Sequence, residues 1–356
     1  MTQTMLRFKF LKTTLFCGLL LTMLIAACSK KDTATIPIVK TGLDSTIKAA
    51  QAFYAATTEG SKPGQYETGS RVAFNTAITA AQTILADPTS TQQQITSAAA
   101  NLAAAMATYQ THYITEISAA NLIGFWKFNG NTKDSSGKAH DGVATVGHVY
   151  YGAGTLAAAA DRFGRAGMAY HFDKGANVEV PYASALNPQQ FSISLWSKKS
   201  SVTRTLNADT YTLASLNRWN GFKVQYQSAN KIFLTVKGVN LTDTAYYDRD
   251  DEVAVLDNDV WYHVVVTFKP GEMDFYINGD LVKSWTNTPN PAITLSTPIN
   301  FVIGQDLPTS KYLTVDGDFQ VAWGGFFTGD IDDVMFYNIA LTGPQVKSIN
   351  TNQKTL

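Results

Sequence analysis

Two motifs at the ends of one long segment decide the fold. The first is Ile-Gly-Phe-Trp-Lys-Phe-Asn-Gly-Asn at residues 123–131, and the second is Gly-Asp-Ile-Asp-Asp-Val-Met-Phe-Tyr at residues 329–337. Between them lie short alternating stretches and turn residues, without the 3.6-residue periodicity of long helices. We therefore expect one large all-β domain over residues 118–345, with its first and last strands adjacent.

Local patterns within this segment predict antiparallel strands. Phe191, Ile193 and Leu195 alternate with serines, which places the apolar side chains on one face of a strand. Residues 273–277 and 281–285 flank Asn278-Gly279, the pair preferred in two-residue hairpins because both turn positions need positive φ. Many short strands without βαβ spacing favour a β-sandwich.

The motifs also resemble a known family. In order they match those of bacterial laminin-G-like domains with the concanavalin A-like lectin/glucanase fold: Phe125-Trp-Lys-Phe-Asn-Gly-Asn131, Asp134-Ser-Ser-Gly137, His140-Asp-Gly142, Tyr170-His-Phe-Asp173, Phe191-Ser-Ile-Ser-Leu-Trp196, Tyr276-Ile-Asn-Gly279 and Gly329-Asp-Ile-Asp-Asp-Val334. The resemblance implies a mainly β fold, a jelly-roll sandwich of two antiparallel sheets. It implies less about the ligand, because one fold hosts many functions.

A helical domain is expected over residues 41–117. Apolar residues recur at spacings of three and four in three segments: Leu43, Ile47, Ala50 and Tyr54; Phe74, Ile78, Ala81 and Leu85; Ile95, Ala99, Leu102, Met106 and Tyr109. Ser90 and Gln93 suggest a capping box for the third helix. The region resembles FIVAR modules in its 59–66 turn and its Gln92-Gln-Gln-Ile95 helix start, which implies a three-helix bundle that acts as a spacer or a weak ligand-binding module.

The N-terminus predicts export and a lipid anchor. Arg7, Lys9 and Lys12 precede an apolar run that ends in Leu-Ile-Ala-Ala-Cys28, the layout of a secretory signal and too short for a comfortable membrane span. The ending resembles a bacterial lipobox, which implies removal of residues 1–27 and acylation of Cys28. Ser29 follows Cys28 directly, where the inner-membrane retention signal has aspartate, so an outer-membrane lipoprotein with a tether at 28–40 is expected. The alternative is a plain signal peptide that contains a cysteine.

Composition excludes some functions. The chain has 28 Lys+Arg and 28 Asp+Glu; loss of three basic residues with the signal peptide leaves 25 against 28, a net charge of −3. Such a balance disfavours nucleic-acid binding. Residues 346–356 are expected to form a C-terminal tail.

Catalytic motifs are weak. Glucanases of this fold carry Glu-x-Asp-x-Glu on one strand, where two carboxylates about 5 Å apart act as nucleophile and acid. The nearest match, Glu272-Met-Asp274-Phe-Tyr276, has tyrosine in place of the third acid. Neither a histidine pair with metal-ligand spacing nor a Gly-x-Ser-x-Gly motif is present. We expect a protein that is not an enzyme.

Calcium is the expected cofactor, because the fold often holds one structural calcium near the junction of its first and last strands. Carboxylate, amide and carbonyl oxygens are the ligands that calcium requires. The candidate ligands are Asp173, Asp332, Asn129, Asp134 and the Gly142 carbonyl. The alternative is that these acids only cap turns.

Carbohydrate is the expected ligand. Exposed aromatic rings stack on sugars, and neighbouring charged groups donate or accept hydrogen bonds. The strongest cluster is Tyr246-Tyr247-Asp248-Arg249-Asp250, with Trp219 and Trp323 in or beside other predicted loops. Trp126, Trp196 and Trp261 are assigned to packing, and the loop aromatics have packing as their alternative too.

The favoured hypothesis is a non-enzymatic, cell-surface carbohydrate-binding lipoprotein that captures polysaccharide or oligosaccharide with possible protein partners. The first alternative is an adhesion or assembly module that binds protein, and a glycoside hydrolase of the same fold is a distant third. Binding of a soluble oligosaccharide separates the first two.

Overall fold

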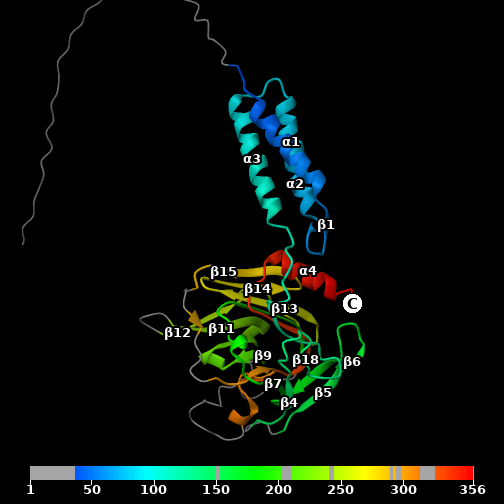
Figure 1. Cartoon of the computed structure of the whole chain (residues 1–356), viewed down its shortest axis with the longest axis vertical. Coiled ribbons are helices and arrows are strands. Elements are labelled where there is room, and N and C mark those ends of the chain that lie inside the picture. The colour runs from blue at the N-terminus through cyan, green and yellow to red at the C-terminus, as the bar shows by residue number, and fades with distance from the viewer. Residues whose placement is uncertain are drawn as a thin grey trace, which may run out of the picture. The chain divides into compact units, whose positions relative to one another are not determined.

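The computed structural model describes residues 37–148, 153–201, 211–239, 244–288, 292–293, 298–312 and 325–355. Within them the chain forms a three-helix bundle and a β-sandwich with a C-terminal helix (Figure 1). Two predicted functional residues, Cys28 and Trp323, lie outside the described residues. No helix in the described ranges is long and apolar enough to span a membrane.

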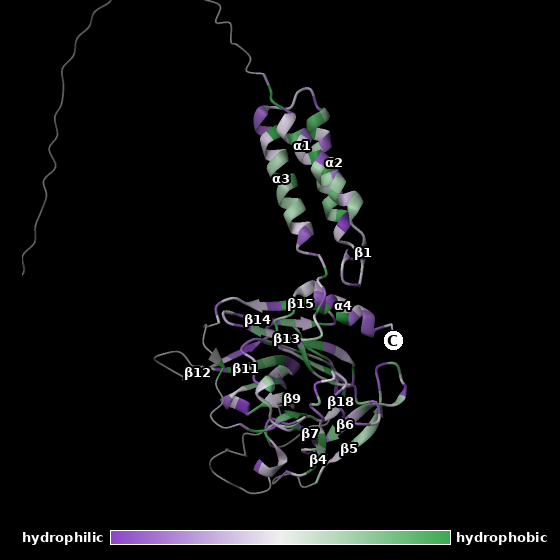
Figure 2. Cartoon of the chain, in the orientation of Figure 1, coloured by the Kyte–Doolittle hydropathy of each residue, from purple (hydrophilic) through white to green (hydrophobic). Residues whose placement is uncertain are grey.

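The bundle consists of α1 (Thr41–Ala56), α2 (Ser70–Ala86) and α3 (Gln92–Gln110), with the short paired strands β1 (Glu59–Gly60) and β2 (Tyr66–Glu67) in the first connection. The predicted apolar positions form its core, among them Leu43, Phe74 and Leu102, each 1% exposed. Figure 2 shows hydrophobic and hydrophilic residues side by side on all three helices, as amphipathic helices require. The predicted bundle is therefore confirmed.

The start of α3 differs by one residue from the prediction. Thr91, not Ser90, is the N-cap, and it exchanges hydrogen bonds with Gln94. The Ser90 hydroxyl instead donates to the carbonyl of Ile84 at 2.8 Å, so it closes the end of α2. Of these two consecutive residues, Ser90 thus caps the end of α2 and Thr91 caps the start of α3.

The sandwich has two antiparallel sheets, which confirms the predicted fold class. Sheet I has the strand order β15 (Asp280–Trp285), β14 (Glu272–Ile277), β13 (Tyr262–Lys269), β8 (Phe191–Lys199), β18 (Gly329–Tyr337), β6 (Ala166–Asp173) and β5 (Thr155–Ala160), with β3 (Leu122–Trp126) also on β18. Sheet II has the order β12 (Thr244–Asp250), β11 (Lys231–Val239), β10 (Phe222–Gln227), β9 (Tyr211–Leu216), β17 (Phe301–Ile303), β7 (Asn177–Val180) and β4 (Val143–Thr145), with β16 (Ala292–Ile293) on β11.

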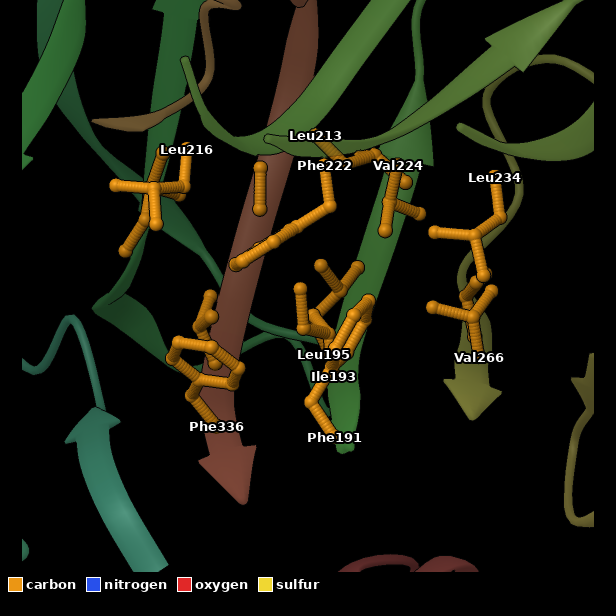
Figure 3. Close-up of a cluster of buried hydrophobic side chains, with 14 of the residues drawn as sticks. Phe191, Ile193, Leu195, Leu213, Leu216, Phe222, Val224, Leu234, Val266 and Phe336 are labelled. Atoms are coloured by element: carbon orange, nitrogen blue, oxygen red, sulfur yellow. The ribbon is translucent and has the colours of Figure 1, made fainter. Parts of the chain in front are cut away.

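The core consists of the alternate side chains along each strand that point between the two sheets. Phe191, Ile193 and Leu195 project from β8 toward Phe222 and Val224 of β10, across the space between the sheets (Figure 3). Their ring and methyl groups are 0–1% exposed. Burial of such surface contributes roughly 25 cal/mol per Å² and is the main force that joins the two sheets.

Two further predictions about strands are confirmed. The first and last strands are adjacent, because β3 pairs antiparallel with β18 through Trp126 and Val334. Asn278 and Gly279 both have positive φ, 53° and 88°, in the turn between β14 and β15. Asn-Gly therefore fixes the register of this hairpin.

The predicted C-terminal tail at residues 346–356 is wrong. These residues belong mostly to α4 (Gly343–Gln353), which begins with a capping box between Thr342 and Gln345. Val346 is fully buried and packs with Val265, Tyr276 and Tyr337 on the outer face of sheet I (Figure 1). The sandwich domain thus extends through α4.

The three tryptophans assigned to packing have different environments. Trp126 is fully buried between the sheets. Trp196 points outward from sheet I and is buried beneath the end of α4, where its indole N–H donates to the Gln353 side chain at 2.8 Å. Trp261 is only half-buried.

Candidate functional site

The outer face of sheet II carries a row of side chains that crosses six strands in register. The row runs from Glu179 through Val302, Ser215, Lys223 and Thr235 to Asp248. Five of the six are polar, and Ser215, Lys223 and Thr235 are at most 6% exposed. A stretch of buried polar groups on an outer sheet face is unusual, since burial of polar groups costs free energy unless they are hydrogen-bonded.

Lys223 lies near the centre of this row. Its ammonium donates to Gln225 Oε1 at 2.8 Å, and the Gln225 amide donates to Gln227 Oε1 at 3.0 Å. Burial lowers the pKa of Lys223 below its ordinary value; the nearby Arg218 adds to this, while Asp306 and Asp248 oppose it. The amine is therefore held in place as a hydrogen-bond donor.

Trp219 stands beside the row on the short turn between β9 and β10. Its ring is half-buried, with the Arg218 guanidinium 4.7 Å and the Lys223 ammonium 5.6 Å from the ring centroid. The next residue, Asn220, accepts a hydrogen bond from Lys237 of β11 at 2.8 Å. An aromatic ring, amines and an amide thus meet at one end of the β9–β10 hairpin.

A buried ion pair fixes this turn. Arg218 donates to Asp306 at 2.6 Å, and Tyr312 bonds to both residues. Burial opposes the charge on Arg218, but Asp306 and Tyr312 raise the pKa of the guanidinium above its usual value. Because Trp219 adjoins Arg218, the network also limits the movement of the tryptophan.

The carboxylates at the ends of the row are far apart. Glu179 and Asp248 are separated by five strand-to-strand steps, or about 24 Å at about 4.8 Å per step. Glycosidases need their two acids about 5 to 9.5 Å apart. The Glu179 carboxylate is also occupied by Thr309 N–H at 2.8 Å and Asn300 at 2.9 Å.

Comparison with known families agrees with this architecture. The family model for the concanavalin A-like lectin/glucanases superfamily matches residues 172–347, and the FIVAR domain model matches residues 39–110. The chain carries a laminin-G-like domain and a FIVAR domain. Both predicted resemblances are therefore confirmed.

Solved structures with a similar fold have low sequence identity. Domain 4 of AbnA, an extracellular arabinanase from Geobacillus stearothermophilus in complex with arabinotriose, is 21% identical with a TM-score of 0.47, over 65% of this chain and 98% of that one. The binding domain of Paraclostridial Mosquitocidal Protein 1 is 14% identical with a TM-score of 0.47, over 66% and 53%. The receptor-binding domain of botulinum neurotoxin mosaic serotype C/D is 17% identical with a TM-score of 0.46, over 66% and 51%. The match thus spans only about half of each toxin domain. No curated protein sequence matches the chain.

The predicted Tyr246–Asp250 cluster of the laminin-G-like domain is a strand, not a loop. It forms most of β12, so its side chains alternate between the two faces of sheet II. Tyr247 points into the core and is 8% exposed. Tyr246 pairs through its backbone with Lys237, and its side chain is outside the described part of the molecule.

Arg249 and Asp250 are engaged at the edge of the sandwich. The Arg249 guanidinium lies 5.0 Å from the centroid of Trp285, and its Nη1 donates to the Asp248 carbonyl at 2.9 Å. The Asp250 carboxylate accepts the Glu252 N–H at 2.9 Å. Of the predicted ligand residues that are described, Trp219 lies with the polar row, and Tyr247 and Arg249 point away from it.

Asp134 and Gly142, two predicted calcium ligands, are occupied by hydrogen bonds from their own turn and, for Asp134, from β3. The Asp134 carboxylate accepts from the backbone N–H groups of Phe125, Ser136 and His140, and its pKa is lowered by these bonds in spite of burial. The Gly142 carbonyl accepts the Thr132 hydroxyl at 2.7 Å. These contacts match the turn-capping alternative.

The other three candidate ligands are in two places. Asp173 and Asp332 are four positions apart in the β6–β18 register, or about 13 Å along the strands. Asn129 and Asp332 line one cavity, but Asp332 already faces the Arg162 guanidinium at 2.6 Å. The described residues hold no cluster of three His, Cys, Asp or Glu side chains that suits a metal ion. These five positions do not form one shared calcium shell, so we expect no structural calcium bound by them.

Proposed function

We propose that the protein is a non-enzymatic carbohydrate-binding lipoprotein of the outer-membrane surface. It captures polysaccharide or oligosaccharide on the outer face of sheet II. The observation that carries the proposal is the polar row from Glu179 to Asp248 with Trp219 beside it.

The chemistry of this face suits sugars. Each sugar hydroxyl both donates and accepts hydrogen bonds, so a site for it needs both kinds of group. Lys223 and Lys237 supply donors, the exposed Asp248 supplies an acceptor, and Gln227 supplies both. Trp219 supplies a ring for the C–H face of the sugar. The strands hold these groups in place, which lowers the entropy that binding costs.

The distribution of acids supports binding over hydrolysis. The carboxylates of the row are about 24 Å apart, well beyond the separation of a catalytic pair. On sheet I, Asp274 of the Glu272–Tyr276 stretch is 9% exposed and accepts the Tyr276 hydroxyl at 3.4 Å. Burial raises the pKa of Asp274, and Glu272 pairs with Lys269 at 2.6 Å.

The anchor part of the proposal rests on the signal sequence that ends at Cys28. Replacement Cys28→Ser removes the thiol that a lipid would modify. We expect this variant to leave the membrane fraction or to remain unprocessed. A Cys28→Ser protein that is cleaved and still membrane-bound would contradict the anchor.

The binding part is tested on a glycan array with the full-length protein in detergent. We expect Trp219→Ala, which removes the stacking ring, and Asp248→Asn, which removes a charged acceptor, each to weaken binding of the strongest glycan by about tenfold or more. For Asp248 the reason is that a hydrogen bond to a charged group contributes about 1.5–3 kcal/mol. Trp261→Ala is the matched control, because Trp261 is also a half-buried tryptophan but belongs to the sheet I side. Absence of any glycan signal, together with capture of a protein partner, would favour the adhesion alternative.

A further inference from the structure

A cavity of about 430 Å³ opens on the sheet I side of the sandwich, away from the polar row of sheet II. It is formed by the end of β3, the turn at 162–165, the middle of β18 and the last turn of α4. Pockets of this size suit small ligands, and those with a few charged groups among apolar ones are the usual binding sites.

The floor of the cavity is a buried group of three ionisable side chains. Arg162 donates to Asp332 at 2.6 Å, lies 3.0 Å from an Asp333 oxygen, and bonds to the carbonyl of Gln353 in α4 at 2.9 Å. The side chains of Arg162, Asp332 and Asp333 are only 4%, 3% and 14% exposed. Two carboxylates therefore share one guanidinium. Burial raises the pKa of both carboxyls, and Asp333 adds to this at Asp332, so near neutral pH the pair keeps a proton and the floor has no excess charge.

A β-bulge brings the two acids together. The pairing of β18 with β8 shifts between Asp332 and Met335, and Asp333 has a φ of 48°, in the left-handed region. Without the bulge, consecutive residues would point to opposite faces of the sheet. Strained backbone of this kind gathers at ligand sites. Asp333 Oδ2 faces Arg162, and the side chain lines the cavity with 14% of its surface exposed, so its carboxyl group can accept a hydrogen bond from a ligand.

The rim carries two cationic side chains. The exposed Lys127 ammonium lies 5.2 Å from the centroid of Phe125, and the Arg165 side chain is 50% exposed and bonded to Asp161. Phe125, Met335 and Ile349 supply an apolar wall. A ligand would thus meet cations at the entrance, carbon groups at the side and a hydrogen-bond acceptor at the bottom.

We propose that this cavity binds an acidic monosaccharide unit, such as a uronic acid at the end of a glycan. Its carboxylate lies against Lys127 and Arg165, its hydroxyls donate to Asp333, and its C–H groups contact Phe125 and Met335. A divalent cation fits less well, because the Arg162 guanidinium already faces both acids. The site is separate from the proposed glycan face of sheet II and does not depend on it.

The test is calorimetric titration of the full-length protein in detergent with methyl glucuronide and methyl galacturonide, against methyl glucoside. We expect saturable binding of at least one uronide and at least tenfold weaker binding of the neutral glycoside. The double variant Lys127→Ala/Arg165→Ala should lose the preference for the uronide, and Asp333→Asn should weaken binding of the uronide about tenfold. Lys48→Ala, an exposed lysine of the bundle, is the control that should change nothing.

Three results would overturn the proposal. They are no saturable uronide binding, equal affinity for the neutral glycoside, and equal affinity for acetate, which lacks hydroxyls. If Asp333→Asn unfolds, the Lys127→Ala/Arg165→Ala variant still tests the proposal, because Lys127 is exposed and Arg165 is half-exposed. Trp219→Ala should leave uronide binding unchanged, which separates this site from the proposed face of sheet II.

Discussion

The two outer faces of the sandwich differ in the side chains that are buried on them, which are apolar on sheet I and polar on sheet II. On sheet I, Val265, Tyr276 and Met335 lie beneath α4 and are at most 7% exposed. On sheet II, Lys223 and Thr235 are equally buried, but they are polar and bonded to Gln225 and Asp248. One face resembles a second hydrophobic core, and the other resembles a binding surface.

The difference separates stability from function. Apolar burial stabilises a fold in proportion to its area. A buried hydrogen-bonded polar group contributes little net stability, and an apolar replacement of similar shape is often nearly neutral. We therefore expect substitutions on the sheet I face to change unfolding and substitutions on the sheet II face to change binding.

The largest effect is expected from Val346→Asp in α4. It places an unpaired carboxylate at a fully buried position against sheet I, which should cost more than about 3 kcal/mol and lower Tm by about 10 °C. Lys354→Asp, at the exposed end of the same helix, should stay within about 0.5 kcal/mol. Thermal unfolding measures both, and similar Tm values would show that α4 adds no stability.

Lys223→Met should change glycan binding much more than stability. Methionine fills similar space without the amine, so we expect the free energy of unfolding to change by less than about 1.5 kcal/mol while glycan affinity falls about tenfold. Denaturant unfolding and glycan titration give the two values. A stability loss comparable to that of Val346→Asp, with affinity intact, would make the polar row structural.

A pH-dependent effect is expected from Asp251→Asn, next to the edge strand β12. Asp251 is fully buried and accepts the Ile232 N–H at 3.0 Å. Burial raises its pKa to about 6, with Asp250 contributing. The native state then binds more protons than the unfolded state between about pH 4 and 6, so stability falls as pH rises through this window. Asparagine should remove that loss and raise stability above pH 6 by about 2 kcal/mol, with little change at pH 4. Tm profiles that stay parallel across this range would contradict the assignment.

The smallest effect concerns calcium. Because Arg162 already neutralises Asp332, we expect EDTA to leave Tm unchanged within about 1 °C. Elemental analysis gives an independent measure. A larger drop that calcium restores would establish a metal site and would require Arg162 to move.

Local patterns predicted much of the fold. The Phe191–Leu195 alternation and the Asn278-Gly279 turn have short-range causes, and both strands and hairpin are present. The mainly polar sequence of α4 does not predict a packed helix, although Thr342, Pro344 and Gln345 are typical of a helix start.

The candidate site was less predictable. The aromatic and charged residues Tyr246–Asp250 are typical of a binding loop, but in a strand their side chains alternate between faces, which places Tyr247 in the core. The row around Lys223 depends on the register of six strands, and no local pattern fixes that register. Arg162 and Asp332 are 170 residues apart, so their pairing has no local signal.

The position of β18 has a consequence for how the protein reaches its folded state. Gly329–Tyr337 lies between β8 on one side and β6 and β3 on the other, so among the described strands it joins the two halves of sheet I. Sheet I cannot close until the chain is available through residue 337, and contacts this distant in sequence fold slowly. If the chain is exported as proposed, it crosses the membrane before its sandwich can assemble. Folding of the sandwich then does not compete with export, because sheet I is complete only when its last strand, β18, has joined it.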